Sequence, residues 1–195
     1  DGYKLVIAPA TLILDENRAA NMISHVQHGG YLILTPRTGV KDRDNAFLIS
    51  RPPGPLREIA GVEVLESFAL DQDVPVKGNW FAGKSRQWTE LLNVTDVNIT
   101  IPAARYETSN GWLDGQPAIS VHGYRGGLVY YVGICLDDKA QEKIIDRVLK
   151  TCALNSVIDA PDGVQVAKRN RADGQEIIFL INHTREKKSI ELKHS

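Results

Sequence analysis

The feature that most constrains the fold is a strand–helix–strand pattern in the first 35 residues. The apolar run Lys4–Ala8 ends at a proline and predicts a buried strand. Asp15 is placed to cap a helix with one apolar face, made of Ala19, Met22, Ile23 and Val26. The pair Gly29-Gly30 can end this helix, and Tyr31–Thr35 predicts a second buried strand. Such a unit favours two parallel strands joined by a right-handed crossover.

A second ordered region lies between residues 117 and 152. Two apolar runs, Pro117–Val121 and Leu128–Val132, flank a glycine-rich segment and predict a hairpin. Asp137-Asp138 then cap a helix whose apolar face comprises Ala140, Ile144, Ile145, Val148, Leu149 and Cys152. Two helices beside buried strands favour a layered α/β fold.

The segments between these regions give weaker signals. Residues 36–55 are rich in Arg, Asp, Gly and Pro and predict a long loop. A short helix is expected over Leu56–Ala60 and a strand over Val62–Leu65. The alternation in Val97–Ile101 predicts a half-buried strand. Periodicity assigns no partners to the rest of residues 71–112.

The C-terminal part predicts a change of architecture. Residues 155–163 contain a proline and predict a linker between an α/β domain at 1–154 and a small β-domain at 164–195. Asp173-Gly174 predicts a hairpin turn among three expected strands, which are Val164–Val166, Glu176–Asn182 and Ser189–Leu192. So short a β-domain cannot bury much core alone, so we expect it to lean on the first domain or to be truncated.

Composition excludes several classes of protein. The chain is 43% apolar and 24% charged, which is typical of a globular domain. Its net charge is −1 with interspersed signs, so nothing favours nucleic acid or an anionic membrane as partner. Two cysteines favour a reducing, cytoplasmic compartment. No apolar run approaches the roughly 20 residues that span a bilayer. Because Asp1 leads almost directly into a strand without a leader, we expect an excised piece of a longer protein.

Few residues are candidates for catalysis or for binding a metal or phosphate. Cys135 follows an apolar strand, but a nucleophile elbow needs glycine on both sides, and only Gly133 is present. A buried structural thiol is the favoured interpretation. Gly29-Gly30 follows a helix instead of preceding one, so it predicts no phosphate loop. The five histidines lack metal-ligand spacing, and surface or cap positions are expected for them. We therefore predict no metal site and no cofactor.

Paired carboxylates and tryptophans were the remaining candidates. Asp137-Asp138 is typical of a helix cap, and Asp42 with Asp44 of loop solvation, so neither predicts a glycosidase pair. Trp80 and Trp88 fit a subunit interface or a satellite core about equally well. A sugar platform is a further alternative for them.

A series of segments matches one known family in the same order along nearly the whole chain. Pro53–Glu58 is the most specific of the matching segments, and the match is weakest over residues 71–112. The other matching segments are Tyr3–Ala10, Gly29-Gly30, Leu32–Thr35, Arg37–Val40 with Asp42 and Asp44, Gly61–Val64, Gly126–Gly133, Leu136-Asp137, Asp159–Val164 and Phe179–Thr184. On these segments the sequence resembles the middle domain of glycoside hydrolase family 42 β-galactosidases.

This resemblance implies a bacterial parent enzyme with three parts. They are a catalytic (β/α)8 barrel, an α/β trimerisation domain like a degenerate, flavodoxin-like class I glutamine amidotransferase, and a β-sandwich tail. Both catalytic glutamates of such a retaining enzyme lie in the barrel, so no catalytic residue is implied for this chain, which should be inactive alone. The implied role is non-catalytic trimerisation and shaping of the active-site mouth. The implied partners are the homotrimer and the barrel of the same full-length chain.

The loop from Arg37 to Leu56 is the best candidate for an interface element, because long loops in compact domains are usually functional. A solvated connector is the alternative. The candidate interface residues are Arg37, Asp42, Asp44, Arg57, Trp80 and Trp88. Two other functions stay open: an amidotransferase-like hydrolase that uses Cys135, and a sugar-binding accessory domain that uses Trp80 and Trp88.

Overall fold

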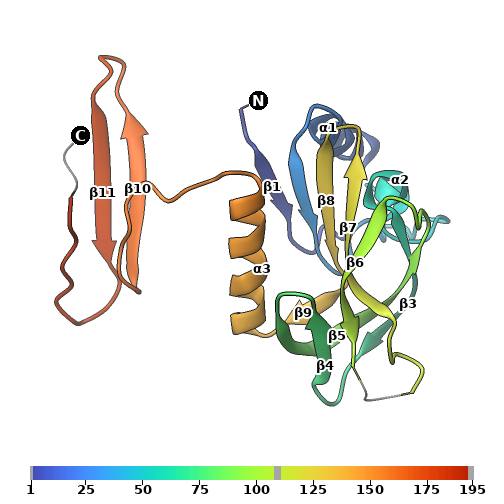
Figure 1. The fold of residues 1–195 in the computed structure, drawn as a ribbon. Coiled ribbons are helices and arrows are strands. Elements are labelled where there is room, and N and C mark those ends of the chain that lie inside the picture. The colour runs from blue at the N-terminus through green and yellow to red at the C-terminus, as the bar shows by residue number, and fades with distance from the viewer. Residues whose placement is uncertain (1, 108–110, 193–195) are drawn as a thin grey trace. The chain divides into compact units, whose positions relative to one another are not determined.

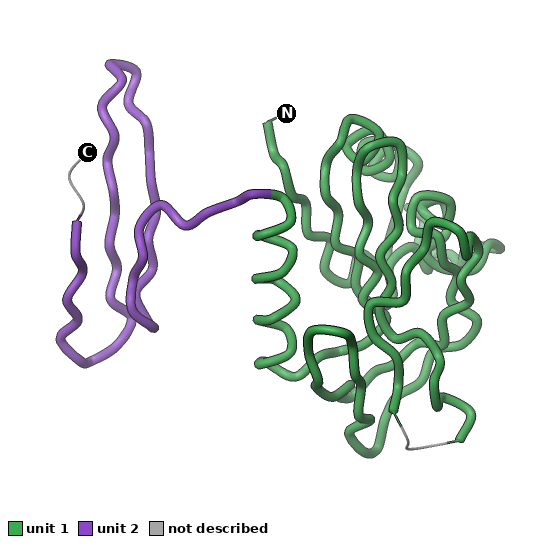
Figure 2. The backbone as a smooth tube through the Cα atoms, in the orientation of Figure 1, with its two compact units in different colours: residues 1–152 green, residues 153–195 purple. Residues whose placement is uncertain are grey.

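The computed structural model describes residues 2–107 and 111–192. The chain forms two compact units, residues 1–152 and 153–195 (Figure 2).

The first unit is built on a nine-stranded mixed sheet (Figure 1). Only β1, β2 and β8 run parallel to one another, and all other pairings are antiparallel. Strand β9 (Ile134–Leu136) pairs with β5 beside the main path. The order along that path is β1 (Leu5–Ala8), β2 (Tyr31–Leu34), β8 (Gly127–Val132), β7 (Pro117–Tyr124), β6 (Thr100–Tyr106), β4 (Val74–Gly78), β5 (Ala82–Val94) and β3 (Val62–Ala69).

Helix α1 (Glu16–Gln27) and the parallel pair around it form as the sequence predicts. The Asp15 carboxylate accepts a hydrogen bond from the N–H of Arg18 at 2.8 Å, which caps the helix. Gly29 follows the helix with φ +88°, a left-handed conformation that suits glycine. Strands β1 and β2 are paired in parallel from Leu5 with Tyr31 to Ala8 with Leu34.

The other two helices also form where the sequence predicts them. A 3-10 turn, η1 (Gly54–Leu56), runs into the short helix α2 (Arg57–Ala60). Helix α3 (Asp138–Thr151) begins after Asp137, whose carboxylate accepts from the N–H of Ala140. None of the described helices is long and apolar enough to cross a membrane.

The sheet is buried on both faces at β2 and β8, which explains their continuous apolar sequences. The edge strand β1 is only partly buried, with Ile7 47% exposed, although the sequence predicts a buried strand there. On β2, Leu32 and Leu34 point into the core that α1 and α2 cover, whereas Ile33 points into the core on the opposite face. Helix α3 packs against that second core through Ala140, Ile144 and Val148.

The prediction of a layered α/β fold like that of flavodoxin or a class I glutamine amidotransferase is wrong. The structure is mostly a mixed β-sheet, with three helices in the part that is described. A flavodoxin-like sheet repeats the strand–helix–strand crossover, but here it occurs once, at β1-α1-β2. Strands β3 to β8 follow one another with no helix between them, so they pair antiparallel.

Two predicted strands also differ from the structure. Residues 97–99 form a turn, in which the Asp96 carboxylate accepts from the N–H of Asn98, and strand β6 starts only at Thr100. In the second unit, β10 (Val164–Asn170) and β11 (Glu176–Asn182) form the hairpin expected around Asp173-Gly174. Residues 189–192 form no third strand there.

Candidate functional site

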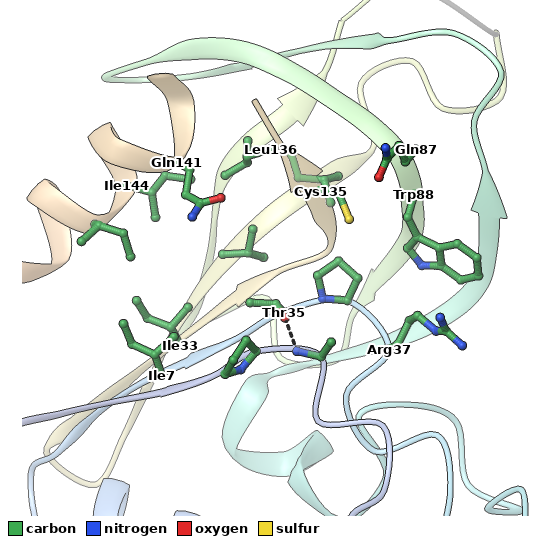
Figure 3. Close-up of a pocket in the computed structure, with 16 residues that line it drawn as sticks. Ile7, Ile33, Thr35, Arg37, Gln87, Trp88, Cys135, Leu136, Gln141 and Ile144 are labelled. Carbon is green, nitrogen blue, oxygen red and sulfur yellow. Dashed lines mark hydrogen bonds between the residues drawn. The ribbon is translucent and has the colours of Figure 1, made fainter. Parts of the chain in front are cut away.

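A cavity of about 600 Å³ opens at the carboxyl ends of β1 and β2 (Figure 3). Ile7 and Ile33 come from these two strands, and β8, β9, β5 and α3 complete the wall. Crevices beyond the carboxyl ends of parallel strands are the usual ligand sites of open α/β sheets. The remaining lining residues are Pro9, Ala10, Thr35, Pro36, Arg37, Gln87, Trp88, Val132, Ile134, Cys135, Leu136, Gln141, Ile144 and Ile145.

A buried carboxylate lies next to this cavity. Glu90 on β5 is 1% exposed, and its two oxygens accept hydrogen bonds of 2.8 Å from the backbone N–H of Arg37 and the hydroxyl of Tyr131. Burial raises the pKa of Glu90 because the ionised form loses its hydration, and the two hydrogen bonds limit the rise. Glu90 therefore ties the end of β2 to β5 and β8.

Arg37 and Trp88 form a stacked pair at the rim of the cavity. The guanidinium carbon lies 5.1 Å from the centre of the indole ring, within the range of a cation–π contact. The indole N–H of Trp88 is buried and meets no partner with hydrogen-bond geometry in the described residues, although it helps to lower the pKa of Glu90. Arg37 and Trp88 are two of the six candidate interface residues, and the structure brings them into contact.

The other candidate interface residues lie elsewhere. Asp42 and Asp44 share a turn in which one Asp42 oxygen accepts from the N–H groups of Asp44 and Ala46, both at 2.9 Å. Arg57 forms an ion pair with Glu63 at 3.0 Å. Asp42 and Arg57 line a separate cavity beside α1.

The two tryptophans do not form a joint sugar platform. Trp80 packs on Phe81, with ring centres 4.7 Å apart, and no ring contact joins it to Trp88 among the residues that the structure describes. Because Arg37 also covers the Trp88 ring, nothing in this arrangement favours the sugar-binding alternative.

Cys135 is poorly suited to nucleophilic chemistry. Its half-buried thiol lines the cavity, and burial, together with the negative charge of Glu90, raises its pKa. A catalytic thiol needs the opposite shift, because the thiolate is the nucleophile. In the described parts of the chain no hydrogen bond joins this thiol to a basic side chain. These surroundings count against the hydrolase alternative.

Sequence reasoning missed a buried carboxylate, Glu90, and a buried imidazole, His122. No spacing rule singles out Glu90 among 24 acidic residues. His122 was expected at the surface or in a cap, but it is buried on β7 and its Nδ1 lies 2.9 Å from Thr100 Oγ1. Burial lowers the pKa of His122. The expectation holds for His28, which is the C-cap of α1.

An exposed apolar surface lies on the long loop after β2. The loop is held by hydrogen bonds from the N–H of Leu14 to the Lys41 carbonyl and from the N–H of Leu48 to the Val40 carbonyl. Phe47 and Ile49 nevertheless project outward, with 74% and 106% exposure. We call these two side chains the loop surface.

Fold and site together define a domain built mostly of one mixed β-sheet, with helices packed on the faces of its parallel part. The chain belongs to the β-galactosidase trimerisation domain family of glycoside hydrolase family 42, whose family model matches residues 1–155.

Relatives and solved structures agree with this membership. The chain is 35% identical to the β-galactosidase BglY of Alicyclobacillus acidocaldarius, over 98% of this chain and 29% of the relative. It is 31% identical to the β-galactosidase BgaA of Clostridium cellulovorans, over 98% of this chain and 28% of the relative. The chain therefore spans less than a third of these curated relatives.

Two solved β-galactosidases share the fold. The enzyme from Rahnella sp. R3 matches with a TM-score of 0.84 and 28% identity, over 93% of this chain and 28% of that one. The enzyme from Bacillus circulans sp. alkalophilus matches with a TM-score of 0.89 and 21% identity, over 97% of this chain and 28% of that one.

Proposed function

We propose that this chain holds together the homotrimer of a larger β-galactosidase, whose catalytic (β/α)8 barrel would hydrolyse terminal β-galactosides. The observation that carries the proposal is the family match over residues 1–155. The contribution of this domain to catalysis would be indirect. It would place neighbouring barrels and shape the mouths of their active sites.

We propose further that the loop surface carries much of the contact between copies. Phe47 and Ile49 are large, exposed apolar side chains on a loop that backbone hydrogen bonds hold in place. Exposed apolar side chains of this kind are typical of interface centres. Asp42, Asp44 and Arg57 lie close by in sequence and supply the polar rim that interfaces commonly have. In a cyclic trimer this surface would contact a different surface of the next copy.

Light scattering after size exclusion tests the proposal. We expect the wild-type chain to have three times the 21.6 kDa monomer mass, because the family domain is an assembly module. Replacing both loop-surface residues, Phe47→Ser with Ile49→Ser, should shift the mass to that of the monomer. The far-UV circular dichroism spectrum should not change, because neither side chain is buried.

A matched control comes from β6 and the turn before it. Val97 and Ile101 are 77% and 65% exposed, so Val97→Ser with Ile101→Ser removes a comparable apolar area at another place. This variant should stay trimeric. If the Val97/Ile101 variant were monomeric and the Phe47/Ile49 variant stayed trimeric, the interface would not lie on the loop. A monomeric wild-type chain would contradict the view that this domain assembles by itself.

A further inference from the structure

The trimer contact proposed above lies on the loop surface and assigns no role to the cavity beside Trp88. We propose that it binds a small carboxylic acid with an apolar body, aromatic or branched, whose carboxylate pairs with Arg37. Three independent properties of the cavity carry this inference: its place and size, the backbone around it, and its one charged side chain.

Place and size are those of a small-molecule site. The cavity lies at the carboxyl ends of the parallel strands β1 and β2, and its volume of about 600 Å³ is within the usual range for ligand pockets. Its apolar lining includes Ile7, Ile33 and Ile144 (Figure 3). Val132 and Ile134 also line it. An apolar ligand body fits such a lining, whereas a bare sugar or an inorganic anion does not.

Unusual backbone conformations gather around this cavity. Six described residues other than glycine have positive φ, and three of them line it: Ala10 at +41°, Arg37 at +68° and Gln87 at +59°. Non-glycine residues avoid this region of φ because of steric repulsion, and such exceptions cluster at ligand sites.

Each of these three residues is fixed by a hydrogen bond from elsewhere in the fold. Thr35 Oγ1 accepts from the N–H of Ala10 at 2.7 Å, and Glu90 accepts from the N–H of Arg37 at 2.8 Å. The carbonyl of Gln87 accepts from the N–H of Leu70 at 2.8 Å. The rim of the cavity is therefore pre-organised.

Arg37 provides the charge that selects a carboxylate. Its guanidinium stacks on Trp88 and makes no ion pair or side-chain hydrogen bond with any described residue, whereas Arg57 is paired with Glu63. The positive charge of Arg37 lowers the pKa of Glu90, but no hydrogen bond or ion pair joins the two side chains, so the guanidinium N–H groups stay available to a ligand. A planar guanidinium favours the two oxygens of a carboxylate over neutral acceptors.

The test compares phenylacetate with phenylacetamide, which has nearly the same shape but no charge. Nuclear magnetic resonance should show saturable movement of the Trp88 indole N–H signal with phenylacetate, while Trp80 and Trp112 serve as internal references. Alkylation of Cys135 by iodoacetamide should become slower as the cavity fills, because this thiol lines it. We expect phenylacetamide to bind about tenfold more weakly, since a hydrogen bond to a charged group is lost.

Two variants test whether the probes bind in this cavity and whether the Arg37 guanidinium selects the carboxylate. Arg37→Gln should remove the preference for phenylacetate, and Gln141→Trp should block both probes by filling the mouth of the cavity. Arg125→Gln is the matched control, because Arg125 also has positive φ and stacks on an aromatic ring, Tyr124 at 5.8 Å, away from the cavity. It should bind phenylacetate like the wild type.

Several results would overturn the proposal. Equal binding of the two probes, or a preference that survives Arg37→Gln, would remove the role of the guanidinium. If neither probe gave a saturable signal, the cavity would not be a binding site for such acids. Protection of Cys135 in the trimer without any added acid, but not in the monomeric loop variant, would show that a neighbouring copy fills the cavity. None of these results changes the mass by light scattering, so the trimerisation proposal is tested separately.

Discussion

Two acidic residues of this domain illustrate how surroundings set a pKa. Asp137 caps α3, and its carboxylate also accepts from the N–H of Lys84 on β5, at 2.6 Å. Burial opposes ionisation of Asp137, but the backbone hydrogen bonds outweigh it and lower the pKa. Glu90 also accepts two hydrogen bonds, yet burial dominates and its pKa is raised. The depth of burial therefore decides the direction of the shift.

The raised pKa of Glu90 predicts a specific pH dependence of stability. The folded-state pKa lies above the ordinary value of 4.5, so the native state binds the proton more tightly than the unfolded chain. The stabilisation is complete below pH 4.5 and is lost as the pH rises through the folded-state pKa. Glu90→Gln cannot titrate, so the wild type should gain melting temperature relative to this variant as the pH falls from neutral towards 4.5.

Thermal unfolding at several pH values measures this difference. Other groups, His122 included, titrate in both proteins and cancel in the comparison. A difference in melting temperature that is independent of pH, or that grows in the opposite direction, would contradict the assignment.

At the scale of elements, the sequence predicts what depends on local signals. The β1-α1-β2 unit, the β7-β8 hairpin and α3 have caps, turns and periodic apolar residues within a few positions of one another. Strand β5 has no such signal, because its 13 residues mix charged and apolar types and contact β3, β4 and β9 over different stretches. Its pairing, and with it the place of Glu90 and Trp88, depends on distant segments.

Gly127 lies at a close approach between β8 and the C-terminal end of α1. A Cβ atom there would collide with the carbonyl oxygens of Val26 and Gly30, both of them backbone atoms that cannot rotate away. Gly127→Ala should therefore reduce the free energy of unfolding by about 1–3 kcal/mol, the range for overpacking a well-packed site. Chemical denaturation with an unchanged m-value would measure this loss.

Gly123 on the same hairpin is the control for that substitution. Its added Cβ would lie 3.5 Å from the nearest Ile99 carbon, which is an ordinary contact. Gly123→Ala should leave stability nearly unchanged. Equal losses for the two variants would show that the hairpin, and not the contact with α1, determines the effect.

At the scale of the whole chain, the two compact units differ in how much buried apolar core they contain. Every buried apolar residue of both core clusters lies within residues 1–152. The second unit contains a two-stranded hairpin whose apolar residues Ile177–Ile181 are each 39–47% exposed. An isolated two-stranded hairpin is marginally stable in water. We propose on this basis that residues 1–154 are the domain and that residues 164–195 depend on additional structure.

Truncation tests that division. A chain ending at residue 155 keeps both cores and α3, so it should unfold cooperatively with a melting temperature within about 4 °C of the full chain. A chain ending at residue 136 is the control: it lacks Ala140, Ile144 and Val148, which fill the core under α3, and should fail to fold cooperatively. If the chain ending at residue 155 also lost its cooperative transition, the C-terminal unit would be part of the same folding domain. The boundary proposed near residue 154 would then be wrong.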